Sequence, residues 1–264
     1  MRSVLLKTIV LIGFVQMITV NALANILPIN NKTTGEISDQ YANLFTPSGS
    51  TFAIWGLIYT LLLGFSVAIL FKSNFEKLPK TALNLFIANS ILNSCWIFVW
   101  HHEMIVLSLG VMLFLLLTLI WLNIVLNSLE LVLIQAVFLR LPFTIYFGWI
   151  TVATIANFTA YFSTYDMPFY GLSEPLWTIV ILSVGVAIGL SQLWIFKKGA
   201  YALVLIWAYF GIYSKHLSES GFNSNYPEII VTTQIAMVVF TLVLLGILIK
   251  ITLTSQNHNN ESFF

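Results

Sequence analysis

Aromatic and amide side chains recur at helical spacing in three apolar stretches of the sequence. Phe52, Trp55 and Tyr59 directly follow a turn that contains Pro47 and Gly49. Rings spaced three or four residues apart share one face of a helix, and such rings offer stacking area to a flat ligand. Amides on neighbouring helices can orient the ligand through hydrogen bonds. The candidate ligand-binding residues are Phe52, Trp55, Tyr59, Asn93, Trp96, Tyr146, Trp149, Ala153 and Asn157.

The same residues also fit a purely structural interpretation. An asparagine inside a membrane needs a hydrogen-bond partner, and a neighbouring helix can supply one. Tryptophans concentrate at membrane interfaces whether or not they bind a ligand. Asn89, Asn93, Trp96 and Trp100 fall on one helical face. Both interpretations stay open for this face.

The sequence contains few groups that could carry out catalysis. It has no paired carboxylates within an apolar stretch, no nucleophile elbow, no H-E-x-x-H motif and no glycine-rich phosphate loop. His101 and His102 are adjacent, and adjacent helical residues point ~100° apart, which disfavours a shared metal ion. We expect a protein that is not an enzyme, with no catalytic residue, no metal site and no required cofactor.

Composition places these residues in a membrane protein. Hydrophobic residues make up 59% of the 264 residues and charged residues 8%, against roughly 25% charged in soluble domains. A bilayer core of ~30 Å requires ~20 apolar residues per helix. The prediction is an all-α integral membrane protein with eight spans, at about 4–27, 51–71, 81–101, 104–126, 137–161, 176–196, 199–216 and 228–251.

The distribution of cations predicts the orientation in the membrane. With the N-terminus inside, most lysines and arginines fall on the inner side, and only Lys32 and Lys215 fall outside. Cytoplasmic loops carry such an excess. We therefore expect both termini in the cytoplasm, in a bacterial cytoplasmic membrane. The cations form no basic stripe, so nucleic acid is not an expected partner.

The first apolar stretch has two interpretations. Arg2 and Lys7 precede it, and Ala22-Leu23-Ala24 resembles a signal peptidase site. Apolar character continues past this site through Ile26 and Leu27, giving enough length to span a bilayer. We expect the first helix to be retained.

Two features outside the spans set the organisation of the chain. The stretch from Leu131 to Tyr161 is too long for one span, so its part before Arg140 should extend the helix or run along the inner interface. Arg140 itself should snorkel to that interface. The polar segment 163–175 predicts a boundary between residues 1–162, with five spans, and residues 163–264, with three.

Three motifs resemble those of the tryptophan-rich sensory protein family (TspO/MBR), which includes the animal translocator proteins. The first is the turn at Pro47 followed by Phe52 and a W-x-x-x-Y pattern at Trp55 and Tyr59. The second and third are similar to the family's L-N-x-x-W and W-x-x-x-A-x-x-x-N patterns, here Leu92-Asn93-Ser94-Cys95-Trp96, and Trp149, Ala153 and Asn157. The resemblance covers about residues 1–162. The turn here has one proline and lacks the tryptophans of the family's turn.

The resemblance implies a five-helix transmembrane bundle that binds porphyrins or other flat hydrophobic ligands under the loop from Pro28 to Ser50. The expected function is a sensor or transporter for a porphyrin or haem-related tetrapyrrole. The alternative is a permease for a small hydrophobic, carotenoid-related or lipid-related solute, with the last three helices as a second wall of its path. A third alternative, proposed within the family, is breakdown of the bound ligand. Besides the bilayer, a second copy of the chain is a candidate partner, because small residues such as Gly148, Ala153 and Ala160 permit close helix contact.

Overall fold

The computed structural model describes residues 2–41, 43–70, 78–165 and 171–261, with side chains from Val4 to Lys250. Residues 71–77, between the second and third predicted spans, and residues 166–170, within the predicted boundary segment, lie outside the described residues. Over the described residues the fold consists of helices and contains no strand. The long helices are α1 (Arg2–Ile26), α3 (Ile54–Ala68), α4 (Lys80–His101), α5 (Ile105–Asn127), α7 (Leu141–Thr164), α8 (Glu174–Phe196), α9 (Gly199–Leu217) and α10 (Pro227–Glu261).

The long helices confirm a multi-pass, all-α membrane protein. Seven of them are long and apolar enough to cross a membrane. The helix α9 is not among these seven, because its 19 residues include Lys215 and His216 in the last turn as well as several tyrosines. The predicted span 199–216 is therefore a helix, but one more polar than the other seven.

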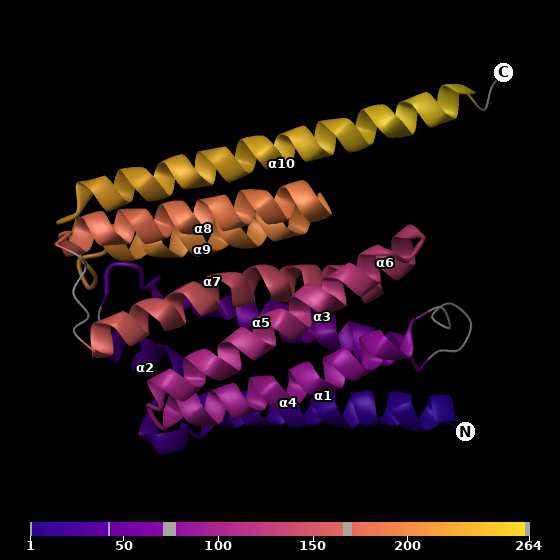
Figure 1. The fold of residues 1–264 in the computed structure, drawn as a ribbon, viewed down its shortest axis with the longest axis horizontal. Helices are drawn as coiled ribbons and strands as arrows, with labels where there is room; N and C mark the ends of the chain where they lie inside the picture. The colour runs from indigo at the N-terminus through magenta and orange to yellow at the C-terminus, as the bar shows by residue number, and fades with distance from the viewer. Residues whose placement is uncertain (1, 42, 71–77, 166–170, 262–264) are drawn as a thin grey trace.

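The helices form two groups that lie side by side (Figure 1). The first group is a bundle of α1, α3, α4, α5 and α7, and the second contains α8, α9 and α10. Of the second group, α9 makes the main contact with the bundle, through α7, and it also packs on α8 and α10. The start of α1 and the end of α10 lie at the same end of the molecule (Figure 1). This geometry places the termini on one side, while the cytoplasmic assignment stays a prediction.

Buried amides join the helices of the bundle. Asn21 Nδ2 donates to Asn93 Oδ1 at 2.6 Å, and Asn93 Nδ2 donates to Tyr146 Oη at 2.8 Å. This chain of bonds links α1, α4 and α7, and Asn93 and Tyr146 are both 0% exposed. Asn89 Nδ2 instead donates to Thr118 Oγ1 of α5 at 2.8 Å. Asn89 and Asn93 thus both bridge helices, as the structural interpretation expects.

Arg140 lies at a break between the short helix α6 (Leu133–Leu139) and α7. The segment before Arg140 is thus a separate helix ahead of α7. The Arg140 guanidinium donates from Nη2 to Leu129 O at 2.8 Å and to Leu126 O at 3.0 Å. Leu126 lies in the last turn of α5 and Leu129 just beyond its end, where backbone acceptors lack helical partners and attract cations. Arg140 therefore caps the end of α5, and its snorkelling to the inner interface stays a prediction.

Two glycines set the packing of the second group. Gly185 and Gly189 are buried on one face of α8. A Cβ atom at Gly189 would lie 2.5 Å from Leu205 Cδ1 of α9 and 2.8 Å from Phe240 Cε1 of α10. At Gly185 it would lie 2.6 Å from Tyr209 Oη, which donates to Leu182 O at 2.7 Å. Helices α8, α9 and α10 meet closely because these positions lack side chains.

Candidate ligand-binding site

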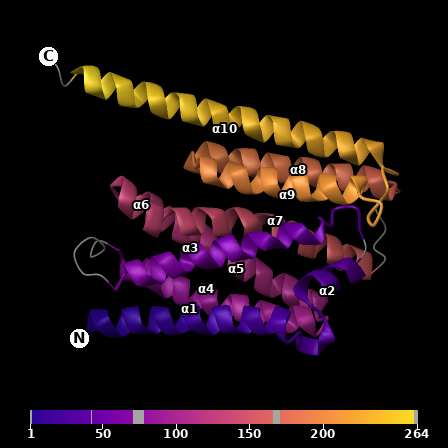
Figure 2. The same cartoon turned by 180° about the vertical axis from the view of Figure 1, so that it is seen from behind.

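The loop between α1 and α3 is folded into short helices. They are η1 (Ile29–Asn31), α2 (Thr34–Gln40) and η2 (Gly49–Ala53). A capping box starts α2, because Thr33 Oγ1 accepts from the Glu36 amide at 3.3 Å and Glu36 Oε2 accepts from the Thr33 amide at 2.7 Å. The Thr33 amide and then its hydroxyl lower the pKa of the Glu36 carboxyl. We call residues 28–53 the lid. It lies at the end of the bundle opposite the start of α1 (Figure 2).

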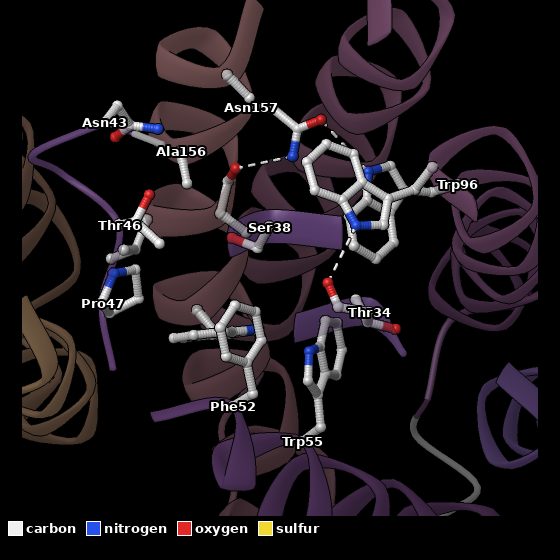
Figure 3. A pocket seen from close by; sticks show the side chains of 15 residues that line it. Thr34, Ser38, Asn43, Thr46, Pro47, Phe52, Trp55, Trp96, Ala156 and Asn157 are labelled. Atoms are coloured by element: carbon white, nitrogen blue, oxygen red, sulfur yellow. Dashed lines mark hydrogen bonds between the residues drawn. The ribbon is translucent and has the colours of Figure 1, made fainter. Parts of the chain in front are cut away.

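A pocket lies beneath the lid, between α3, α4 and α7. The cavity volume is about 40 Å³, and the empty space of the hollow, which includes open solvent, is about 580 Å³. Figure 3 shows Phe52 and Trp55 on one side and Asn157 and Trp96 on the opposite side. The lining residues are Thr34, Ser38, Asn43, Thr46, Pro47, Phe52, Trp55, Trp96, Trp100, Trp149, Val152, Ala153, Ala156, Asn157 and Ala160.

Aromatic rings form two walls of this pocket. The Trp149 ring meets Phe52 edge-to-face at a centroid distance of 5.9 Å and Trp55 at 6.2 Å. On the α4 side, Trp96 and Trp100 stack at 5.6 Å with an interplanar angle of 18°. Edge-to-face and offset-stacked contacts are favourable aromatic geometries, so they hold the rings in fixed orientations. Each wall therefore presents preorganised apolar surface to the cavity.

The structure brings most of the candidate residues to this pocket. Tyr59 lines a neighbouring cavity of about 130 Å³ together with Asn21 and Asn25, and Trp55 lines both cavities. Asn93 and Tyr146 lie outside the pocket lining, in the hydrogen-bonded chain between α1, α4 and α7. The candidates that line the pocket are Phe52, Trp55, Trp96, Trp149, Ala153 and Asn157.

Hydrogen bonding separates the polar groups of the pocket into two kinds. Asn157 is satisfied, because Oδ1 accepts from Ser108 Oγ at 2.9 Å and Nδ2 donates to Ala153 O at 3.2 Å. Trp149 Nε1 and Thr34 Oγ1 are buried and have no partner within the described part of the chain. Trp149 is 3% exposed and Thr34 6%. An unpaired buried donor carries a desolvation cost that a ligand acceptor would remove.

Sequence reasoning missed the polar residues that the lid contributes. Thr34, Ser38, Asn43 and Thr46 all line the pocket. The signal that could have found them is the Thr33-x-x-Glu36 capping box, which marks the start of a helix within the loop. Trp100, which was noted only as part of the α4 face, also lines the pocket.

The histidine pair lies beside the lid. His101 Nδ1 is 2.9 Å from Ile97 O, and His102 Nδ1 is 2.8 Å from Phe98 O, so each ring bonds its own helix. His101 is fully buried, whereas His102 is exposed. Among the described residues, no group of three histidine, cysteine or acidic side chains could hold a metal ion.

Comparison with known families decides the identity of this fold. The family model described as TSPO-like protein matches residues 7–251. The chain belongs to the TSPO-like protein family. The TSPO-like match extends past the sequence motifs, from α1 into α10, and so includes the three helices after residue 163. Comparison with curated proteins and with solved structures gives no match.

Proposed function

We propose that this protein is a membrane-embedded sensor or transporter without enzymatic activity, whose pocket takes a flat hydrophobic ligand of the porphyrin class. The observation that carries the proposal is the pair of aromatic walls facing a cavity in which the buried N–H of Trp149 has no partner. Ligand pockets combine apolar walls with a few oriented polar groups. The tetrapyrrole class itself comes from the family resemblance.

The lining restricts the chemistry of the ligand. None of the residues that line the pocket carries a charge. An ionised group is costly to bury without a partner, so the carboxylates of a porphyrin would stay at the mouth, near the lid. Trp149 Nε1 and Thr34 Oγ1 would donate to neutral acceptors on the ligand.

The lid must move before a large ligand can enter. Pockets for drug-sized ligands measure roughly 300–1,000 Å³, and the cavity volume here is about 40 Å³. Thr46 and Pro47 of the lid line the pocket together with the aromatic walls (Figure 3). Displacing this segment would give a porphyrin access to both walls.

Binding is tested by titrating the purified protein with protoporphyrin and following the absorption of the porphyrin. Trp149→Phe keeps a ring but removes the N–H, so we expect affinity to fall about fivefold. Trp149→Leu also removes the aromatic wall and should weaken binding further. The matched control is Trp194→Leu, since Trp194 is 83% exposed on α8. Absence of saturable binding at tens of micromolar, or equal affinity in all variants, would contradict the proposal.

One observation favours the permease as a second candidate. A groove of about 370 Å³ lies between α3, α7 and α9, with a mainly apolar lining that includes Leu57, Val204 and Trp207. It adjoins the start of α3, whose Trp55 lines the pocket. A hydrophobic solute could pass from the bilayer along this groove. Uptake of such a solute into proteoliposomes, above that into protein-free vesicles, would support the permease, and binding without uptake would argue against it.

A homodimer remains a prediction, and its interface would have to use a surface other than the small residues on which the prediction was based. The small residues on which it rested are occupied, because a Cβ at Gly148 would lie 3.0 Å from Val204 Cβ of α9, and Ala153 and Ala160 line the pocket. Sedimentation in detergent distinguishes a monomer from a dimer.

The orientation is also a proposal. Arg2 begins α1 and Lys250 belongs to α10, and the start of α1 and the end of α10 lie at the same end of the molecule (Figure 1). Cytoplasmic flanks are rich in such cations. We place this end in the cytoplasm. A reporter fused to the C-terminus that is active only outside the cytoplasm should be silent, and activity would reverse the assignment.

A further inference from the structure

The first part of the lid, residues 28–34, is attached to α4 and to the residues that follow α4. Asn30 Nδ2 donates to His101 O at 3.1 Å, and Trp100 Nε1 donates to Thr34 O at 3.3 Å. Lys32 Nζ and Glu103 Oε1 form an ion pair of 2.7 Å. These contacts tie this part of the lid to the bundle.

The second part of the lid, from Asp39 to Thr51, is attached to α9. Trp207 Nε1 donates to Thr51 O at 2.9 Å, and the Ser48 amide donates to Gly211 O at 3.0 Å. His216 Nε2 is 2.9 Å from Leu44 O. An ion pair of 3.0 Å joins Lys215 Nζ to Asp39 Oδ1, although such an exposed pair contributes little. This second part of the lid is therefore anchored to the second group of helices.

The closest of these contacts requires a glycine. A Cβ at position 211 would overlap Thr51 Oγ1 and would lie 2.9 Å from Thr51 Cβ. Thr51 immediately precedes Phe52, whose ring packs on Trp149 inside the pocket. Holding Thr51 therefore also holds one aromatic wall in place.

We propose that α9 positions the second part of the lid and controls how readily the pocket opens, with Trp207 and Gly211 as positioning residues. The role in ligand exchange rests on the proposed binding function. Each neutral hydrogen bond contributes only modestly to the closed state, so thermal opening needs just a few weak bonds to break. The second group of helices thus acts as the latch of the binding site.

The latch is tested by amide hydrogen exchange in the full-length, ligand-free protein. Trp207→Phe keeps a ring but removes the donor to Thr51 O, and Gly211→Ala separates the two backbones. We expect exchange of the lid amides at 44–53 to accelerate about fivefold. Exchange in α5, which has no contact with the lid among the major helix contacts, should stay unchanged. The Ser48 amide is a direct reporter, since it donates to Gly211 O.

Matched controls separate the latch from general loosening. Trp194→Phe alters an 83% exposed tryptophan of α8, and Gly246→Ala adds a methyl group where nothing lies within 4 Å. Neither should change exchange in the lid. Unchanged lid exchange in both Trp207→Phe and Gly211→Ala would overturn the latch, and so would equal acceleration in α5.

A second measurement addresses ligand exchange. In the Trp207→Phe variant, association and dissociation of protoporphyrin should both accelerate about fivefold, because a less stable closed lid shortens both steps. If protoporphyrin fails to bind the unmodified protein, the proposed ligand is wrong, whereas the hydrogen-exchange result still decides the latch. Binding with unchanged rates in this variant would contradict control of the pocket by α9.

Discussion

Replacing Asn93 by leucine should lower the free energy of unfolding by about 2 kcal/mol. The change removes the bonds to Asn21 and Tyr146 and leaves the Tyr146 hydroxyl buried without a partner. Interhelical bonds in membranes average ~0.6 kcal/mol, with a maximum near 1.7. Two bonds are lost here and one hydroxyl is stranded, so the expected cost lies above that average. Reversible unfolding in detergent measures it.

A double variant measures the cost of leaving the Tyr146 hydroxyl buried without a partner. Asn93→Leu combined with Tyr146→Phe removes both partners, so it should cost no more than Asn93→Leu alone. The control is Asn127→Leu at the end of α5, because both polar atoms of this side chain are buried without a partner among the described residues. Asn127→Leu should be neutral or stabilising. A cost equal to that of Asn93→Leu would show that bridging by Asn93 does not determine stability.

Replacing Gly189 by leucine should destabilise the second helix group by about 3 kcal/mol. The side chain would collide with Leu205 of α9 and Phe240 of α10 at once. Both neighbours are almost fully buried, at 1% and 0% exposure, so neither can turn away freely. We expect a lower unfolding temperature and faster hydrogen exchange in α8 and α10.

The series at this helix includes its own controls. Gly189→Ala should cost less than leucine, because a methyl group overlaps less of the space that Leu205 and Phe240 occupy. Ala187→Leu adds the same bulk on the exposed face of α8 and should be neutral. If Ala187→Leu and Gly189→Leu were equally destabilising, the close approach at Gly189 would not be the cause.

Patterns among residues that are close together in the sequence are sufficient to predict the membrane helices and much of the pocket. The length and apolar content of each stretch depend only on neighbouring residues, which is why the all-α membrane class and the spans followed from composition. Helical periodicity likewise puts Trp149, Ala153 and Asn157 on one face of α7, where they line the pocket. The spacing of Gly185 and Gly189 was a further local signal of close helix packing that sequence reasoning did not use.

Partner choice between helices was decided only by the tertiary structure. Asn89 and Asn93 are one turn apart on α4, yet one bonds α5 and the other joins α1 to α7. Arg140 donates a hydrogen bond to the end of α5, and Trp207 donates one to Thr51, which is far away in sequence. Periodicity states which residues share a face but leaves open which helix that face meets, because this depends on the rotation and crossing of whole helices. For the same reason, the sequence predicted the aromatic walls of the pocket, and only the assembled helices placed the latch of its lid on α9.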